Sequence, residues 1–403
     1  MIFVFYFFAA LLIFLSYRSF IGGIAYRNFL RDKHAAPRSG DEPFATILAP
    51  CRGGDAEFSE NLARLFQQEY RDYEIVFAVD DPEDDAVPEI RRAISEFKDV
   101  PAKLIVAAKA KSNAQKAENL REAVLHVAPQ SKVFAFVDSD VRISPDWLGR
   151  LTAPLANESV GASTGYRWFV SQRPTLANEL LSAWNASIAS ALGPNRKSNF
   201  CWGGSTGILR STFERLDIRG KWSSIVAEDF VLTRAVQDAG LDVEFVPHAI
   251  CASPADVSTL SLWEFTTRQI KITRVYRSDL WGLSFFGSAL FCTVIVGAIV
   301  IAVFSGNVVE RSVAVATLIL VTVFSVHKSY FRVRSVADVI SSSSRELRRH
   351  RITHAALFAL TPALFLLNSI AALFSRTILW RSTEYKMVSP TETIVRETKF
   401  RED

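Results

Sequence analysis

The longest apolar run in the chain covers residues 283–304, and this feature limits the possible folds most. A helix needs only about 20 apolar residues to cross the hydrocarbon core of a bilayer, so a run of this length is sufficient. A second and weaker apolar run follows at residues 313–326. The sequence therefore predicts a C-terminal transmembrane region, which we assign to residues 282–375, with a basic cytoplasmic loop inside it.

The chain also begins with an apolar segment. Residues 2–15 are almost wholly apolar, no basic residue precedes them, and no small-residue cleavage site is evident. This pattern favours a retained signal anchor over a cleaved signal peptide, and we assign the anchor to residues 1–30. Basic residues follow it, namely Arg18, Arg27, Arg31 and Lys33. Because positive charge marks the cytoplasmic side, we expect the domain that follows to be cytoplasmic and the protein to cross the membrane several times.

The last apolar segment, residues 353–375, contains Pro362 and Asn368. Such a segment either spans the membrane or enters and leaves on one side, and the sequence leaves both readings open. Arginines precede it and mark the cytoplasmic side again; these are Arg332, Arg334, Arg345, Arg348, Arg349 and Arg351. Residues 376–403 are predicted to form a polar tail.

Composition narrows the function classes. Hydrophobic residues make up 49% of the 403 residues, which is high for a soluble enzyme, and the excess lies in the runs described above. The formal net charge of +4 is too small to favour a nucleic-acid partner. The four cysteines have no CxxC pair and no metal-ligand spacing, which argues against zinc and fits a reducing compartment.

Residues 44–257 alternate between strand and helix patterns and are predicted to form one domain. Strands alternating with helices predict an α/β fold with a mostly parallel sheet, right-handed crossovers and helices on both faces. The predicted strands cover residues 45–50, 73–79, 103–107, 133–137, 160–170 and 241–249, and the predicted helices cover 60–68, 89–97, 114–127, 175–192 and 227–239.

Acidic residues follow two of these strands. Asp138 and Asp140 come directly after one buried strand, and Asp80 and Asp81 after another. Ligands of α/β sheets collect at the carboxyl ends of the strands, and two adjacent carboxylates stay ionised cheaply only around a cation. Oxygen ligands suit Mg²⁺ or Mn²⁺, which often share substrate phosphates. One shared site is therefore favoured, and the alternative is a set of ordinary solvated loop acids.

A predicted helix over residues 258–281 carries a basic stripe, made of Arg268, Lys271, Arg274 and Arg277. An amphipathic helix of this kind can lie in the membrane interface with its basic side chains at the headgroups. It can equally hold an anionic diphosphate, and we expect the two roles to be divided among its residues. Glu228 and Asp229 open another predicted helix, where acids are commonly only partners of the helix dipole.

Taken in order, these motifs resemble those of membrane-anchored family-2 glycosyltransferases, and most closely those of ceramide glucosyltransferases and their bacterial lipid-glycosylating relatives. The resemblance runs from the strand at Thr46 to the basic helix near Arg277 and weakly into the tail. It implies a GT-A-like (Rossmann-like) fold for residues 44–257, with transmembrane helices at the N-terminal and C-terminal ends.

The resemblance also implies roles for single residues. Asp80 or Asp81 takes the place of the aspartate that contacts the uracil base, and Lys116 and Asn119 match a Lys-x-x-Asn-Leu nucleotide segment. In the family, the two aspartates of a DxD pair hold the diphosphate and the metal ion, and a third aspartate is the catalytic base. The residues that match these motifs are Asp138 and Asp140 for the pair and Asp229 for the base.

The segment from Arg268 to Ile272 lies where the family has (Q/R)xxRW. Lys271 replaces the arginine. This replacement keeps the positive charge, so that Lys271 and Arg268 can both contact a diphosphate, but it loses the planar two-pronged hydrogen bonding of arginine to phosphate. Ile272 replaces the tryptophan and cannot stack on a sugar as an indole can. The acceptor side of the site therefore departs from the family pattern.

The function implied is an inverting, metal-dependent transfer of a hexose from a UDP-sugar to the hydroxyl of a membrane lipid such as ceramide, with UDP-glucose as the favoured donor. A basic interfacial helix suits an acceptor whose hydroxyl lies at headgroup depth. Another lipid (diacylglycerol or a hopanoid), a processive polysaccharide synthase and a non-catalytic membrane scaffold remain as alternatives. The residues do not choose the sugar, and no nucleic-acid partner is expected.

Overall fold

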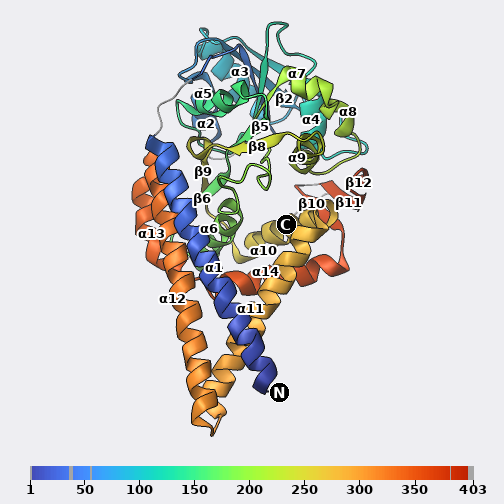
Figure 1. Cartoon of the computed structure of the whole chain (residues 1–403). Helices are drawn as coiled ribbons and strands as arrows, with labels where there is room; N and C mark the ends of the chain where they lie inside the picture. The colour runs from blue at the N-terminus through green and yellow to red at the C-terminus, as the bar shows by residue number, and fades with distance from the viewer. Residues whose placement is uncertain (1, 36–39, 55–56, 382, 398–403) are drawn as a thin grey trace. The chain divides into compact units, whose positions relative to one another are not determined.

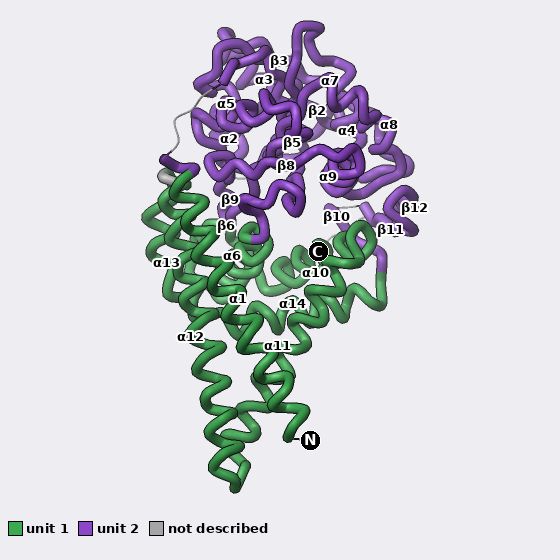
Figure 2. Tube along the Cα trace, in the orientation of Figure 1, with its two compact units in different colours: residues 1–32, 169–190, 255–375 green, residues 33–168, 191–254, 376–403 purple. Residues whose placement is uncertain are grey.

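The computed structural model describes residues 2–35, 40–54, 57–381 and 383–397. Parts of the predicted polar tail lie outside these ranges. The chain forms two compact units, which are considered separately (Figure 2). The helical unit comprises Met1–Asp32, Phe169–Ser190 and Ala255–Ser375, and the α/β unit comprises Lys33–Trp168, Ala191–Pro254 and Arg376–Asp403.

The α/β unit is built on a seven-stranded sheet with the strand order β3-β2-β1-β4-β7-β5-β8 (Figure 1). Strands β1 to β4 pair in parallel, and their bounds fall within one residue of the predicted ones. They are β1 (Ala45–Pro50), β2 (Tyr73–Val79), β3 (Ala102–Val106) and β4 (Val133–Val137), joined by α2 (Phe58–Phe66), α3 (Ala86–Glu96) and α4 (Gln115–Ala123).

The second half of the sheet is mixed. Strand β7 (Ser205–Leu209) runs antiparallel to β4 and to β5 (Val160–Thr164), and β5 pairs in parallel with β8 (Asp242–Phe245). The strand predicted over residues 160–170 is in fact two strands, because the chain turns at Gly165, where a Cβ would collide with the carbonyl oxygen of Ala249. Beyond the turn, β6 (Arg167–Ser171) pairs with β9 (Cys251–Ala255) in a separate two-stranded sheet.

Apolar side chains fill both faces of the seven-stranded sheet, because successive residues of a strand point to opposite faces. Ile47 and Phe77 join one cluster with α2, α3 and α5 (Trp147–Thr152), and Leu48 and Phe136 join the other with α4 and α9 (Glu228–Asp238). Each fully buried side chain of this kind contributes about 1.5–3 kcal/mol. The predicted α/β class, with helices on both faces of a mostly parallel sheet, is confirmed.

Among the residues that the structure describes, three helices are long and apolar enough to cross a membrane, or up to four if a bent pair forms one span. The three are α1 (Ile2–Ala35), α11 (Ser278–Phe304) and α12 (Val308–Val339). They share an apolar cluster that includes Leu12, Val294 and Val321. The rings of Tyr17 on α1 and Phe324 on α12 lie 5.6 Å apart.

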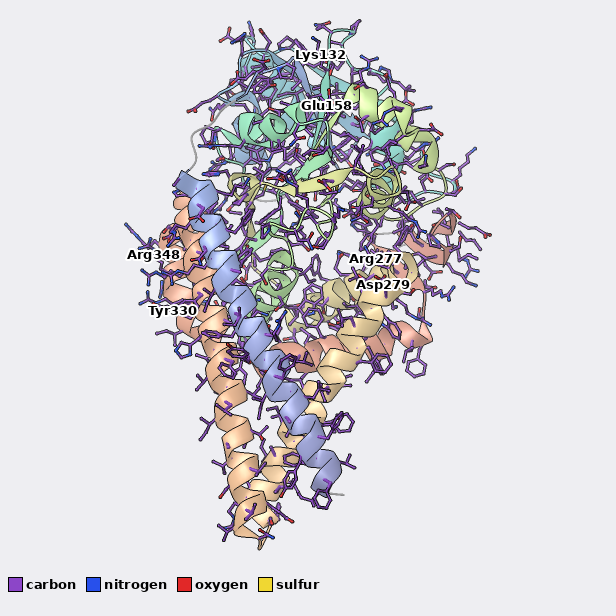
Figure 3. The ribbon with its side chains drawn as sticks, in the orientation of Figure 1. Lys132, Glu158, Arg277, Asp279, Tyr330 and Arg348 are labelled. Carbon is purple, nitrogen blue, oxygen red and sulfur yellow. The ribbon has the colours of Figure 1, made fainter. Side chains whose placement is uncertain are left out.

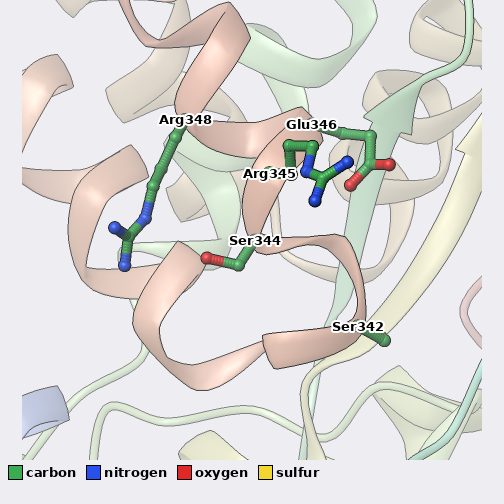
Figure 4. Close-up of a pocket in the computed structure, with 5 residues that line it drawn as sticks. All are labelled: Ser342, Ser344, Arg345, Glu346 and Arg348. Atoms are coloured by element: carbon green, nitrogen blue, oxygen red, sulfur yellow. The ribbon is translucent and has the colours of Figure 1, made fainter.

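The bent pair consists of α13 (Ser344–Ala356) and α14 (Leu360–Phe374), whose axes differ by 75°. At ~1.5 Å per residue, the 15 residues of α14 reach roughly 22 Å, which is less than the ~30 Å of a bilayer core. Helix α14 alone is therefore too short for a straight span. A pocket of about 590 Å³ lies at the start of α13, between serine hydroxyls and charged side chains (Figure 4).

The helix predicted over residues 258–281 ends earlier, so this expectation was wrong in its extent. Helix α10 (Thr259–Tyr276) stops because Arg277 leaves the helical conformation, with φ −144° and ψ 70°. Arg277 forms an ion pair of 2.8 Å with Asp279, in the first turn of α11 (Figure 3).

The predicted polar tail has a structure that the sequence analysis did not anticipate. It folds into three antiparallel strands, β10 (Thr377–Trp380), β11 (Thr383–Ser389) and β12 (Glu392–Glu397). Tyr385 and Met387 are buried, whereas Lys386 between them is exposed, which is the alternation of a half-buried strand. The hydroxyl of Tyr385 accepts a hydrogen bond from the backbone N–H of Gln115 and so ties the tail to α4.

Candidate active site

Asp80 and Asp81 follow strand β2 and share one cation. Lys109 Nζ lies 3.0 Å from Asp80 Oδ2 and 3.1 Å from Asp81 Oδ2. Asp80 is buried and Asp81 is half-exposed. Asp80 Oδ1 is enclosed and accepts no hydrogen bond from the residues that the structure describes. Lys109 was missed in the sequence analysis, although its position just past the end of β3 could have indicated it.

Lys116, in the first turn of α4, joins acids from two other elements. Its Nζ lies 2.6 Å from Asp138 Oδ1, after β4, and 2.7 Å from Glu228 Oε1, at the start of α9. Burial alone lowers the pKa of Lys116, but the two carboxylates outweigh burial and raise that pKa above its usual value. Lys116 therefore remains charged, and α4, α9 and the end of β4 meet at one ion-pair cluster.

Asn119, one turn further along α4, lies behind this cluster. Its side chain is buried, donates a hydrogen bond to the carbonyl of Ala78 and accepts one from Gln115. Both ends of the amide group are thus used inside the protein. Asn119 thus fixes α4 to the end of β2, and each end of its amide group can form one further hydrogen bond.

Asp138 and Asp140, which the sequence analysis predicts to share a metal ion, both contact the guanidinium of Arg167. Arg167 Nη2 lies 3.2 Å from Asp138 Oδ2 and 2.8 Å from Asp140 Oδ1. Burial raises the pKa of Asp138, but the charges of Lys116 and Arg167 outweigh it and leave the pKa below its usual value. Asp138 therefore remains ionised, and it contacts the same nitrogen of Arg167 as Asp140 does.

This geometry fits a divalent cation. Among the described residues, no group of three or more His, Cys, Asp or Glu side chains could hold a metal by itself. Mg²⁺ and Mn²⁺ sites that share substrate phosphates need only one or two carboxylates from the protein. Because a single nitrogen of Arg167 touches both Asp138 and Asp140, the two can share one ion.

Asp229 occupies the first turn of α9, next to Glu228. Its carboxylate accepts hydrogen bonds from the backbone N–H groups of Phe230, at 2.8 Å, and of Gly203. The side chain is half-buried, and burial of the carboxyl group, together with the charge of Glu228, raises the pKa of Asp229 to about 7. A carboxylate with such a pKa can accept a proton near neutral pH.

The glycine-rich turn over residues 201–207 allows these acids to come together. A Cβ on Gly203 would collide with Glu228 Oε1 and would lie 3.0 Å from Lys116 Nζ. A Cβ on Gly204 would lie 2.6 Å from Asp138 Oδ2. The acids that approach this turn come from segments that are distant in the sequence.

Arg268 and Lys271 belong to α10 in the helical unit, so the cluster in the α/β unit is built without them. The guanidinium of Arg268 lies over the ring of Phe265, 5.4 Å from its centroid. Burial lowers the pKa of Lys271. Ile272, at the position of the family's tryptophan, is buried and packs as an aliphatic residue.

The α/β unit thus contains three acids paired with lysine or arginine side chains, namely Asp80, Asp138 with Lys116, and Asp140. It also contains Asp229, whose carboxyl group titrates near neutrality. Carboxylates can hold an anionic group through a metal ion that both bind, and lysine and arginine side chains can bind such a group directly. The carboxyl group of raised pKa can remove a proton from a hydroxyl.

Comparison with known proteins agrees with this chemistry. The model of glycosyl transferase family 21 matches residues 10–393. Ceramide glucosyltransferase 1 of Caenorhabditis elegans is 22% identical over 233 residues, which are 57% of this chain and 50% of that protein. The chain thus spans about half the length of this curated relative.

Solved structures of low similarity were also found. A mannosyltransferase from Pyrobaculum calidifontis, in complex with GDP-Man and Mn²⁺, is 16% identical, covers 91% of this chain and 99% of its own, and has a TM-score of 0.46. Glucosyl-3-phosphoglycerate synthase from Mycobacterium tuberculosis, in complex with Mn²⁺ and UDP-glucose, is 14% identical, covers 62% and 82%, and has a TM-score of 0.37.

The family match covers nearly the whole chain, including both units and the segments that carry the acids. The predicted enzyme class and the predicted resemblance to ceramide glucosyltransferases are confirmed. On this evidence the chain is a glycosyltransferase and belongs to glycosyl transferase family 21.

Proposed function

We propose that the protein transfers a hexose, with inversion, from a UDP-sugar to the hydroxyl of a membrane lipid. The observation that carries the proposal is Asp229, a carboxyl group with a pKa of about 7, next to the ion-pair cluster around Lys116. UDP-glucose is the favoured donor and ceramide the favoured acceptor, because the curated relative is named a ceramide glucosyltransferase.

The donor base is proposed to bind at the end of β2. Uracil carries an imide N–H, and Asp80 Oδ1 is an enclosed acceptor without a donor among the described residues. A buried acceptor of this kind costs about 1–3 kcal/mol until a donor reaches it. Asp81 is half-exposed, so Asp80 is the better candidate for the base contact.

The donor diphosphate is proposed to bind beside Asp138 and Asp140, which would hold Mg²⁺ or Mn²⁺. When bound, such an ion stabilises the negative charge that develops on the leaving diphosphate. Lys116 adds a fixed charge close to the same point, because it contacts Asp138 at 2.6 Å. Arg268 and Lys271 remain candidates for a further diphosphate contact, from α10.

Asp229 is proposed as the catalytic base. The acceptor oxygen attacks the anomeric carbon on the face opposite the diphosphate, and the bond from that carbon to the diphosphate oxygen breaks. The hydroxyl proton passes to the Asp229 carboxylate, and the bonding electrons leave with UDP. A base with a pKa of about 7 takes an alcohol proton far better than an ordinary aspartate, with a pKa of ~3.9, would.

A lipid acceptor is supported by the helical unit. Helices α1, α11 and α12 are long and apolar enough to cross a membrane. Basic residues lie in the last turn of α1 and in the second half of α12, namely Lys328, Arg332 and Arg334, which is typical of the cytoplasmic side. We therefore propose a cytoplasmic catalytic domain over 44–257, between an anchor at 1–30 and a membrane region at 282–375, in a bacterial inner membrane.

The test uses the purified full chain in lipid nanodiscs with UDP-[¹⁴C]glucose and, separately, ceramide or diacylglycerol. We expect one labelled sugar per lipid by mass spectrometry, with inverted anomeric configuration by NMR, and loss of transfer in EDTA. Asp229→Asn is the inactive variant, and Asp238→Asn, an exposed acid on the same helix, is its control. Label found only in a water-soluble polymer would instead support a polysaccharide synthase.

A further inference from the structure

Arg167 is held between the two acids of the proposed metal site. Its Nη2 contacts Asp138 Oδ2 at 3.2 Å and Asp140 Oδ1 at 2.8 Å. Its guanidinium also lies over the ring of Trp202, 5.2 Å from the centroid. Only 14% of the side chain is exposed, so Arg167 is a built part of the site rather than a surface residue.

The charges of this cluster are nearly balanced by protein groups alone. Asp138, Asp140 and Glu228 supply three negative charges, and Lys116 and Arg167 supply two positive ones. A divalent ion held by the two carboxylate oxygens that Arg167 contacts would compete with the guanidinium for them. Because like charges repel strongly at such short range in partly buried surroundings, the ion and Arg167 compete for one position.

A nucleoside diphosphate removes this conflict. Its oxygens bring two or more negative charges, and a guanidinium binds phosphate oxygens with two parallel hydrogen bonds. The flat ring of Trp202 gives the guanidinium a surface on which it stays in contact as it turns from the carboxylates to the diphosphate.

We infer that Arg167 is an internal counter-cation that occupies the metal position until the donor diphosphate draws it away, so that metal ion and donor bind cooperatively. This inference rests on the proposed function, which assigns the metal ion to Asp138 and Asp140. Arg167 is a positioning residue in this account, because it acts by controlling access to the two carboxylates.

The experiment measures Mn²⁺ binding by electron paramagnetic resonance on the full chain in nanodiscs, with and without UDP. In the wild type we expect UDP to tighten Mn²⁺ binding by about tenfold or more, within the usual range of coupling between two ligands. By reciprocity, Mn²⁺ tightens UDP binding by the same factor. In Arg167→Gln we expect tighter Mn²⁺ binding without UDP and a coupling factor clearly smaller than in the wild type, because only the direct attraction between ion and diphosphate is left.

Arg142→Gln is the matched control, because Arg142 follows Asp140 by two residues but pairs with Glu57 instead of the acids of the site. It should keep the wild-type coupling. Arg167→Lys keeps the positive charge and should retain part of the coupling, and thermal unfolding of each variant checks that it is folded.

Two outcomes overturn the inference and can be told apart. Equal Mn²⁺ affinity in the wild type with and without UDP, at normal catalysis, removes the role of Arg167 and leaves the proposed function intact. Failure of the wild type to bind Mn²⁺ even with UDP removes the proposed metal site and the inference with it.

Discussion

Lys116 Nζ lies 2.7 Å from Glu228 Oε1, and this ion pair joins the first turn of α4 to the first turn of α9. The same nitrogen binds Asp138, so one lysine connects the diphosphate end of the proposed site to the helix that carries the base. The position of Asp229 relative to Asp138 thus depends on Lys116, which belongs neither to α9 nor to the end of β4.

Removing this lysine should damage both stability and activity. Lys116→Gln leaves Asp138 and Glu228 facing each other without their shared cation, and the three side chains are 16%, 17% and 7% exposed. Breaking such a nearly buried pair costs about 3 kcal/mol. We expect a lower unfolding midpoint in chemical denaturation and a fall in kcat. Lys116→Arg should recover most of the stability, and the double variant Lys116→Gln, Glu228→Gln should recover part of it.

Catalysis should depend on the titration of Asp229. Because the ionised form is the base and the pKa of Asp229 is about 7, kcat should rise about tenfold per pH unit below pH ~7 and level off above it. The measurement is a pH–rate profile with a saturating donor. An acid limb near pH 4 would contradict the assignment, and Asp238→Asn should keep the wild-type profile.

The same titration makes a separate prediction about stability. The folded pKa of Asp229 lies above its unfolded value, so the folded state binds the proton more tightly. Its contribution to stability is therefore fully present below pH ~4 and is lost as pH rises to ~7. An asparagine side chain does not titrate, so the melting temperature of Asp229→Asn relative to wild type should increase from pH 4 to pH 8. A difference that is constant over this range would mean that burial does not raise the pKa.

The core strands and the acids were predictable because local sequence determines them. Strand β4 is a short apolar run with Asp138 and Asp140 directly after it, so its position and its carboxyl end are visible without a partner. Arg167 was not predictable as a site residue, because it lies in a run that read as one strand. Only the close approach of Gly165 to Ala249, distant in sequence, shows that the run breaks there.

The C-terminal strands illustrate the same limit. Tyr385 and Met387 alternate with polar residues, but the segment is too short for this alternation to be recognised as a strand within a polar tail. Their burial depends on pairing with β10 and β12 and on the contact of Tyr385 with Gln115. Lys109 lies just past the predicted strand at residues 103–107, but only the pairing of β2 with β3 brings it to Asp80 and Asp81.

The turn before β7 should tolerate no side chain at Gly203. In Gly203→Ala the new Cβ would push against Glu228 Oε1 and Lys116 Nζ, and crowding of this kind costs about 1–3 kcal/mol. We expect a lower melting temperature and at least a tenfold loss of kcat. Gly193→Ala is the control, because a Cβ there would meet nothing within 4 Å. Full activity of Gly203→Ala would show that the Lys116–Glu228 pair need not keep its position.

The two acids after β2 should differ in their effect on donor binding. Asp80→Asn replaces an enclosed acceptor oxygen by a group whose orientation is set by Lys109, and the lost hydrogen bond to the base costs about 1.4 kcal/mol, or roughly tenfold in KM for the UDP-sugar. Asp81→Asn changes a half-exposed side chain that contacts the same lysine, so the KM for the UDP-sugar should change by less than about threefold. Initial rates at varied UDP-glucose measure both, with kcat as the internal control, since neither acid is placed at the reacting carbon. A larger KM effect from Asp81→Asn than from Asp80→Asn would transfer the base contact to Asp81.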